Sequence, residues 1–85
     1  TDIYSLAAMT YEMLTGEPPH TGTSAQAIIA KLMTTQPQPV RVLRPSVPGN
    51  VAMAVERGLA KLPADRFGTA REFAQALSNT AFTTG

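Results

Sequence analysis

Few side chains in this chain could carry out chemistry. His20 is the only histidine, cysteine is absent, and seven basic and six acidic residues are scattered over 85 positions. A metal site needs several His, Cys or carboxylate ligands close together, and a catalytic nucleophile needs an adjacent base. Neither set can be assembled around His20, so the sequence predicts no metal-ligating and no catalytic residue. The lack of cysteine also excludes disulfides and fits a reducing cytoplasm.

Composition and charge exclude further classes of function. The chain is 44% hydrophobic and 15% charged, which argues against disorder, and its net charge of +1 gives no electrostatic basis for binding nucleic acid. We expect no signal peptide and no membrane-spanning helix in this sequence, because no apolar run approaches roughly 18 residues. Its size allows one small domain. Because the chain starts with Thr1 at a helix start, we expect it to be a piece of a longer protein.

The first predicted helix, about 3–15, is the element around which the others should be organised. Thr1 or Asp2 can cap it and Gly16 should end it. At about 100° per residue, its apolar side chains cover roughly 220° of the helix surface. A helix packed against one layer shows a stripe somewhat over 100° wide, so this helix should be central. Three short helices cannot surround it fully.

Three further helices complete an expected all-α fold. The second, about 24–35, follows a Thr23–Gln26 capping box. The third, about 50–61, should place Arg57 and Lys61 in its last turns, and the fourth, about 69–79, follows a Thr69–Glu72 capping box. Four prolines make residues 36–48 an irregular connection, and residues 80–85 read as the start of a linker. The predicted inward-facing residues are Val51, Ala52, Val55 and Leu59 in the third helix and Ala70, Phe73, Ala74 and Leu77 in the fourth.

Two runs of residues resemble the C-terminal lobe of eukaryotic-type protein kinases. The run from Asp2 to Pro19, D-I-Y-S-L-A-x-x-x-Y-E-M-L-T-G-x-P-P, is similar to the F helix of that lobe. Residues 59–67, L-A-K-L-P-A-D-R-F, resemble the turn between the lobe's last two helices in bacterial serine/threonine kinases. The resemblance covers nearly the whole chain but only about the last third of a kinase domain. It implies that residues 1–79 are a partial kinase domain with helices like F, G, H and I.

The resemblance implies a parent enzyme that transfers the γ-phosphoryl group of ATP to protein Ser or Thr with magnesium. The Gly-rich loop, strand lysine, H-R-D loop and D-F-G motif are all absent here. The segment should therefore bind no cofactor and be inactive alone. In Asp65-Arg66-Phe67-Gly68 an arginine interrupts the letters D, F and G, and we reject this run as a metal site.

Three positions of the first helix take roles from the resemblance. Asp2 matches the aspartate that holds the catalytic loop, a role compatible with capping the helix. Met9 and Met13, four residues apart, match anchors of the apolar column that reaches the adenine ring, and by composition alone they predict core packing.

Glu12 and Arg66 are candidates for ion pairs. Glu12 lies on a narrow polar strip and is either a solvated side chain or, by resemblance, an acid that pairs with a substrate arginine. Arg66 by itself is a surface arginine beside Asp65. By resemblance it forms a buried pair with the glutamate of the A-P-E motif, which would precede Thr1. Without that partner, we expect it to turn toward water or the fragment to loosen.

Two residues depart from the family pattern. His20 stands where the family more often has Phe, and Ala7 stands where it usually has Gly. The first change weakens an apolar contact. The second should slightly impede a close backbone approach.

Two classes of function therefore stay open from the sequence. The chain is either a kinase fragment that supplies the scaffold of the lobe and part of a docking surface, or a non-catalytic interaction module or pseudokinase lobe. The expected partners are the rest of a kinase domain, a protein substrate or regulator, and, for the isolated fragment, a second copy. We expect a cytoplasmic location, compatible with a membrane anchor further along the parent. The protein partner would bind the apolar stripe of the second helix, formed by Ile28, Ile29, Leu32 and Met33.

Overall fold

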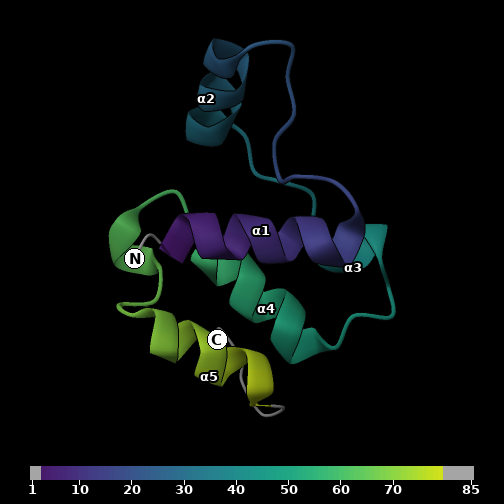
Figure 1. Ribbon diagram of the computed structural model, residues 1–85, viewed down its shortest axis with the longest axis vertical. Helices are drawn as coiled ribbons and strands as arrows, with labels where there is room; N and C mark the ends of the chain where they lie inside the picture. The colour runs from purple at the N-terminus through teal and green to yellow at the C-terminus, as the bar shows by residue number, and fades with distance from the viewer. Residues whose placement is uncertain (1–2, 80–85) are drawn as a thin grey trace.

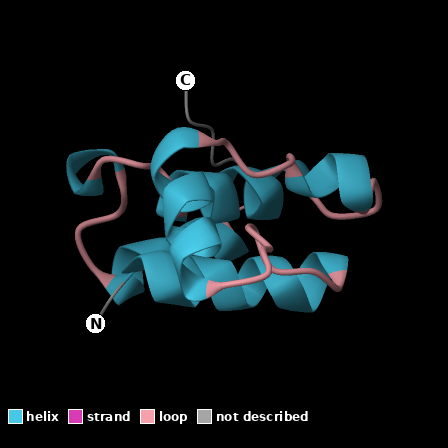
Figure 2. Ribbon diagram, turned by 90° about the horizontal axis from the view of Figure 1, so that it is seen from above, coloured by secondary structure: helices cyan, strands magenta, loops and turns pink. Residues whose placement is uncertain are grey.

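The computed structural model describes residues 3–79, which form helices and loops only (Figure 2). The expected all-α class is confirmed. Residues 1–2 and 80–85, which include the cap expected at Thr1 or Asp2 and the expected linker, lie outside this range. Between positions 3 and 79, no helix combines the length and apolar character needed to cross a membrane. The elements are α1 (Ile3–Thr15), α2 (Ala25–Thr34), α3 (Val40–Leu43), α4 (Gly49–Gly58), the 3-10 turn η1 (Pro63–Asp65) and α5 (Ala70–Ser78).

Helix α1 is the axis of the bundle. It packs on α3, α4 and α5, and Figure 1 shows it crossing the molecule above α4. Its buried stripe consists of Ile3, Ala7 and Tyr11, spaced by one helical turn each. Gly16 ends the helix as predicted, with a φ of 84° and its amide 2.8 Å from the Glu12 carbonyl oxygen. Glycine adopts this left-handed conformation without a Cβ penalty.

Helix α4 crosses α1 at very close range. A Cβ atom built on Gly58 would lie only 2.6 Å from the Cβ of Ala7, which is fully buried. The crossing is therefore possible because residue 58 is glycine. The close approach that we expected Ala7 to impede is accommodated by the missing side chain of Gly58 on the facing helix.

The structure corrects one predicted helix boundary and reveals one helix that was not predicted. Helix α4 ends at Gly58, three residues earlier than expected. The carbonyl oxygens of Ala60 and Lys61, which the prediction placed in the last turn of this helix, instead accept hydrogen bonds from the Arg66 side chain. The proline-rich connection also contains α3, whose first amide, on Val40, donates to a Glu56 carboxylate oxygen at 3.0 Å. That contact between distant residues was invisible in the local sequence.

Two local predictions were also wrong, by one and by two positions. Ser24, rather than Thr23, caps α2, since its side chain accepts a bond from the Ala27 amide at 3.2 Å. In α5, Ala74 is exposed and Ala76 is buried instead. The buried face of α5 is centred on Phe73, from which Ala74 is rotated by about 100°. The Thr69 cap is confirmed, with its hydroxyl oxygen 3.1 Å from the Glu72 amide.

Helix α2 stands apart from the other helices. Figure 1 shows it above α1, connected to the rest of the chain by a loop at each end. None of its residues is buried.

Candidate functional site

The exposed face of α1 carries a shallow hollow of about 440 Å³, lined by Met9, Glu12, Met13 and Gly16. Met9 is 62% exposed and Met13 is 73% exposed, so neither side chain has the core position that its residue type alone indicated. The prediction that the other helices leave part of the apolar arc of α1 uncovered is confirmed. The hollow thus brings together three of the residues that the sequence singled out.

Glu12 is an exposed carboxylate beside the apolar side chains of Met9 and Met13. Among residues 3–79 it has no hydrogen-bond or ion-pair partner for its side chain. The hollow therefore offers apolar area together with one acceptor group for a cationic or hydrogen-bonding ligand. Asp2, the other acidic candidate of this helix, lies outside the described residues, and its role stays a prediction.

Arg66 lies at the opposite end of α1 from the hollow, and its guanidinium group does not turn toward water, the first of the two outcomes that we expected. It is half-buried, with Nε donating to the Ala60 carbonyl at 2.6 Å and Nη2 donating to the Lys61 carbonyl at 3.3 Å. Its guanidinium carbon also lies 5.0 Å from the centroid of the Tyr4 ring, in cation–π geometry. Backbone carbonyls and an aromatic face thus stabilise the charge, and within the described residues it makes no ion pair with Asp65.

The predicted stripe of α2 is largely open to solvent. Ile29 is 56% exposed and Met33 is 69% exposed, while Ile28 is at the exposed limit and Leu32 is half-buried. The surface of α2 is therefore an unpartnered apolar face in this chain, as a docking helix would present.

His20 lies in the loop between α1 and α2. Partial burial lowers the pKa of its imidazole, and the nearby ammonium groups of Lys61 and Lys31 lower that pKa further. The neutral form is therefore favoured. Over the described part of the chain, no three His, Cys, Asp or Glu side chains are grouped so that they could hold a metal ion.

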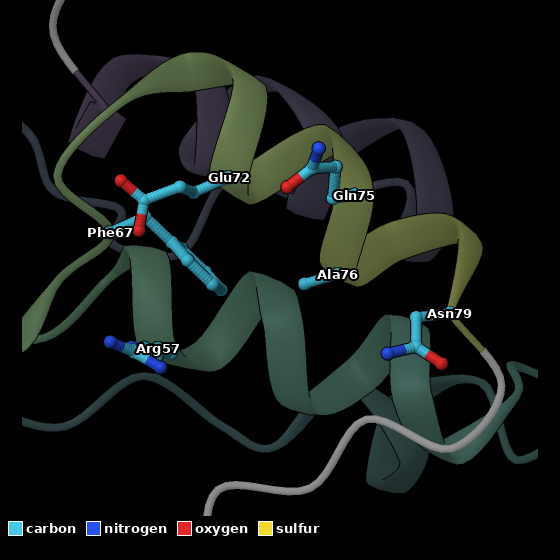
Figure 3. Close-up of a pocket in the computed structure, with 6 residues that line it drawn as sticks. All are labelled: Arg57, Phe67, Glu72, Gln75, Ala76 and Asn79. Atoms are coloured by element: carbon cyan, nitrogen blue, oxygen red, sulfur yellow. The ribbon is translucent and has the colours of Figure 1, made fainter.

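A second hollow, of about 460 Å³, lies along α4 and α5 (Figure 3) and was not predicted from the sequence. Arg57 extends from α4 over the Phe67 ring, 4.5 Å from its centroid, and Glu72 lies at the start of α5. The opposite charges on its rim give the hollow no preference for anions or cations. Its lining is Arg57, Phe67, Glu72, Gln75, Ala76 and Asn79.

Comparison with known proteins places the chain among kinase sequences, although no family model matches it. The chain is 42% identical over 76 residues to serine/threonine-protein kinase PknH of Mycobacterium tuberculosis, a match that covers 88% of this chain and 12% of PknH. It is 40% identical over 84 residues to PknD of the same species, covering 98% of this chain and 12% of PknD. For PknE the identity is 37% over 75 residues, covering 88% of this chain and 13% of PknE.

The chain thus spans only 12–13% of the length of these relatives. Its helical fold agrees with the helical lobe expected from the first predicted helix and from the turn at residues 59–67. The chain is a distant homologue of one segment of the mycobacterial serine/threonine-protein kinases.

Proposed function

We propose that this chain is the C-terminal helical part of a bacterial serine/threonine-protein kinase domain, with α1, α2, α4 and α5 equivalent to helices F, G, H and I. The observation that carries the proposal is the incomplete cover of α1. This helix packs on α3, α4 and α5, yet keeps Met9 and Met13 exposed. A central helix with one exposed apolar face is expected in a lobe that is separated from the rest of its domain.

In this proposal the segment acts as a scaffold. Asp2 holds the catalytic loop of the parent, Met9 and Met13 anchor its apolar column, and Glu12 receives substrate arginine. The exposed face of α2 forms part of the surface on which a protein substrate or regulator docks. ATP and magnesium bind the parent outside this segment, and the parent works in the cytoplasm.

A second candidate is a non-catalytic interaction module. It is favoured by one observation, the solvent-exposed apolar side chains of α2, among which Ile29 and Met33 are more than half exposed. A pseudokinase lobe would use the same face. The two candidates differ in whether the α1 hollow serves phosphoryl transfer.

A chimeric kinase distinguishes the kinase segment from the interaction module. The segment of PknD that matches over 84 residues is replaced by this chain, and transfer of labelled phosphate from ATP to a protein substrate is measured. We expect the chimera to be active. Its Asp2→Ala variant should lose most of its kcat while the KM for ATP changes little, because loop positioning fails and the nucleotide pocket stays intact.

A folded but inactive chimera would contradict the kinase proposal and favour the interaction module. An unchanged kcat in the Asp2→Ala variant would leave only helix capping as the role of Asp2. Folding of each chimera is checked by its far-UV circular dichroism and its thermal transition.

A further inference from the structure

Helix α2 is a projecting arm with little support of its own. It is 10 residues long, buries none of them, and is not among the helices that pack extensively on α1 or α4. Isolated helices shorter than about 12 to 15 residues are marginal in water. Something outside α2 must therefore hold it in place.

Lys61 provides that support. Its ammonium group donates to the carbonyl oxygens of Thr35 at 2.6 Å and Leu32 at 3.2 Å. These carbonyls lie at the C-terminal end of α2, where helix carbonyls have no partner within the helix and where positive charge is favourable. Lys61 was expected to serve the end of its own helix, but that helix ends at Gly58 and the ammonium group serves α2 instead.

The backbone that carries Lys61 is itself fixed. Arg66 binds the carbonyls of Ala60 and Lys61, and its guanidinium lies over the Tyr4 ring of α1. A continuous series of contacts thus runs from α1 through Arg66 and Lys61 to the end of α2. The Lys61 side chain thus connects the arm to the axis of the bundle, and the Tyr11 hydroxyl also holds the chain beyond α2, since it donates to the Gln38 carbonyl at 2.6 Å.

We propose that Lys61 is a latch that fixes α2 relative to the bundle, and that opening it frees α2 while α1, α4 and α5 stay packed. The latch would determine how α2 presents its apolar face. That consequence for docking depends on the proposed function, whereas the latch itself depends only on the contacts of Lys61.

The test measures the position of α2 directly. The chain contains no cysteine, so spin labels can be attached to cysteines introduced at the exposed positions Gln26, in α2, and Arg71, in α5. In the cold and at a concentration where the chain is monomeric, the wild-type background should give a narrow distance distribution. Lys61→Met should broaden it, and Lys61→Arg, which keeps charge and donors, should preserve it.

Lys31→Met is the matched control. The Lys31 ammonium group donates to the Thr21 carbonyl at 2.6 Å, a contact that stays within the arm and its loop. This variant removes the same charge from the same region without cutting the tie to the bundle. Its distance distribution should remain narrow.

Hydrogen exchange adds an independent measurement. Because a charge-assisted hydrogen bond is lost, amides of α2 should exchange roughly tenfold faster in Lys61→Met, while amides of α4 and α5 keep their rates. Three results of the spin-label experiment would each contradict the latch: a broad distance distribution in the wild-type background, an unchanged distance distribution in Lys61→Met, or equal broadening by Lys31→Met or Lys61→Arg. In the hydrogen-exchange experiment, faster exchange of amides throughout the bundle would contradict it as well.

The test of the Lys61 latch and the test of the kinase proposal can give different results. If Lys61→Met frees α2 but the kinase chimera is inactive, the latch stands and the kinase proposal falls. If the chimera is active and α2 stays immobile in Lys61→Met, the kinase proposal is supported and the latch is contradicted.

Discussion

Glu12 is an exposed carboxylate beside Met9 and Met13, without a side-chain partner among residues 3–79. If it receives substrate arginine, Glu12→Gln in the active chimera should lower kcat/KM for peptides with arginine before the target hydroxyl more than for peptides without it. The difference should correspond to about 1.5 to 3 kcal/mol, the range for a hydrogen bond to a charged group.

Glu17→Gln supplies the control for this comparison. Glu17 is also exposed and lies just beyond Gly16, but it does not line the hollow. Its substitution should affect both peptide sets alike. Equal losses on both sets in Glu12→Gln would mean that Glu12 is only a solvated side chain.

His20 gives the isolated chain a specific pH dependence. Its folded-state pKa is lowered, by burial first and by Lys61 and Lys31 next, so the unfolded chain binds the proton more tightly. The contribution to stability is therefore present above the unfolded pKa of about 6.5 and is lost as pH falls toward the folded pKa. We expect the urea midpoint to fall between neutral and mildly acidic pH, and to fall less in His20→Phe. Parallel pH profiles for the two proteins would contradict this role.

The residue types of the candidate site could be named from the sequence, but their surroundings could not. Arg66 shows why. Its partners are the carbonyls of Ala60 and Lys61 and the ring of Tyr4, none of which is a charged residue that a sequence pattern would pair with arginine. Which carbonyls are free depends on where α4 ends, and that is decided by tertiary packing.

At the scale of elements, several helix ends are completed by side chains far away in the sequence. The Asn50 side-chain amide donates to the carbonyl of Leu77 at 3.0 Å at the end of α5, and Arg44 Nη1 donates to the Leu14 carbonyl at 3.0 Å at the end of α1. Local signals such as Gly16 and Thr69 located helix boundaries correctly. Distant caps, like the Glu56 contact that starts α3, have no local signal.

The crossing of α1 and α4 yields a prediction about packing. Gly58→Ala should destabilise the chain by about 1 to 3 kcal/mol, because its new methyl group overlaps Ala7 and the packed core must move. Adding Ala7→Gly should recover much of that loss, apart from about 1 kcal/mol for glycine inside a helix. Urea unfolding of the two single variants and the double variant measures this coupling.

Gly49→Ala is the control for this cycle. A Cβ on Gly49 would meet its nearest neighbour, Arg41 Nη1, at an ordinary 3.7 Å. This variant should be neutral or slightly stabilising, and Ala7→Gly should not alter its effect. Additive effects of Gly58→Ala and Ala7→Gly would show that the two sites do not share one contact.

For the whole molecule, the width of the apolar arc of α1 was more informative than any single residue. It predicted both a central helix and an incomplete cover, because the arc exceeds what three short helices can bury. The direction in which α2 projects could not be predicted in this way. An amphipathic stripe shows that a helix has a face to bury, but not whether that face is covered in the same chain.

The chain by itself should therefore be helical but incompletely packed. We expect strong far-UV helicity, binding of a hydrophobic dye, a broad thermal transition, self-association at higher concentration and no nucleotide binding. Met9→Gln with Met13→Gln should reduce dye binding and self-association while helicity is kept, since the two side chains are 62% and 73% exposed. Met33→Gln, in which a comparably exposed methionine (69%) of α2 is changed, is the control and should reduce both less.

The opposite behaviour would change the preferred function. A monomer with a sharp, cooperative transition and no dye binding would mean that the helices form a complete domain despite the bare face of α1. The Met9 and Met13 surface would then not be the contact with the rest of a kinase lobe. In that case the α2 face would be the remaining apolar surface to explain, and the interaction module would be the better account of the chain.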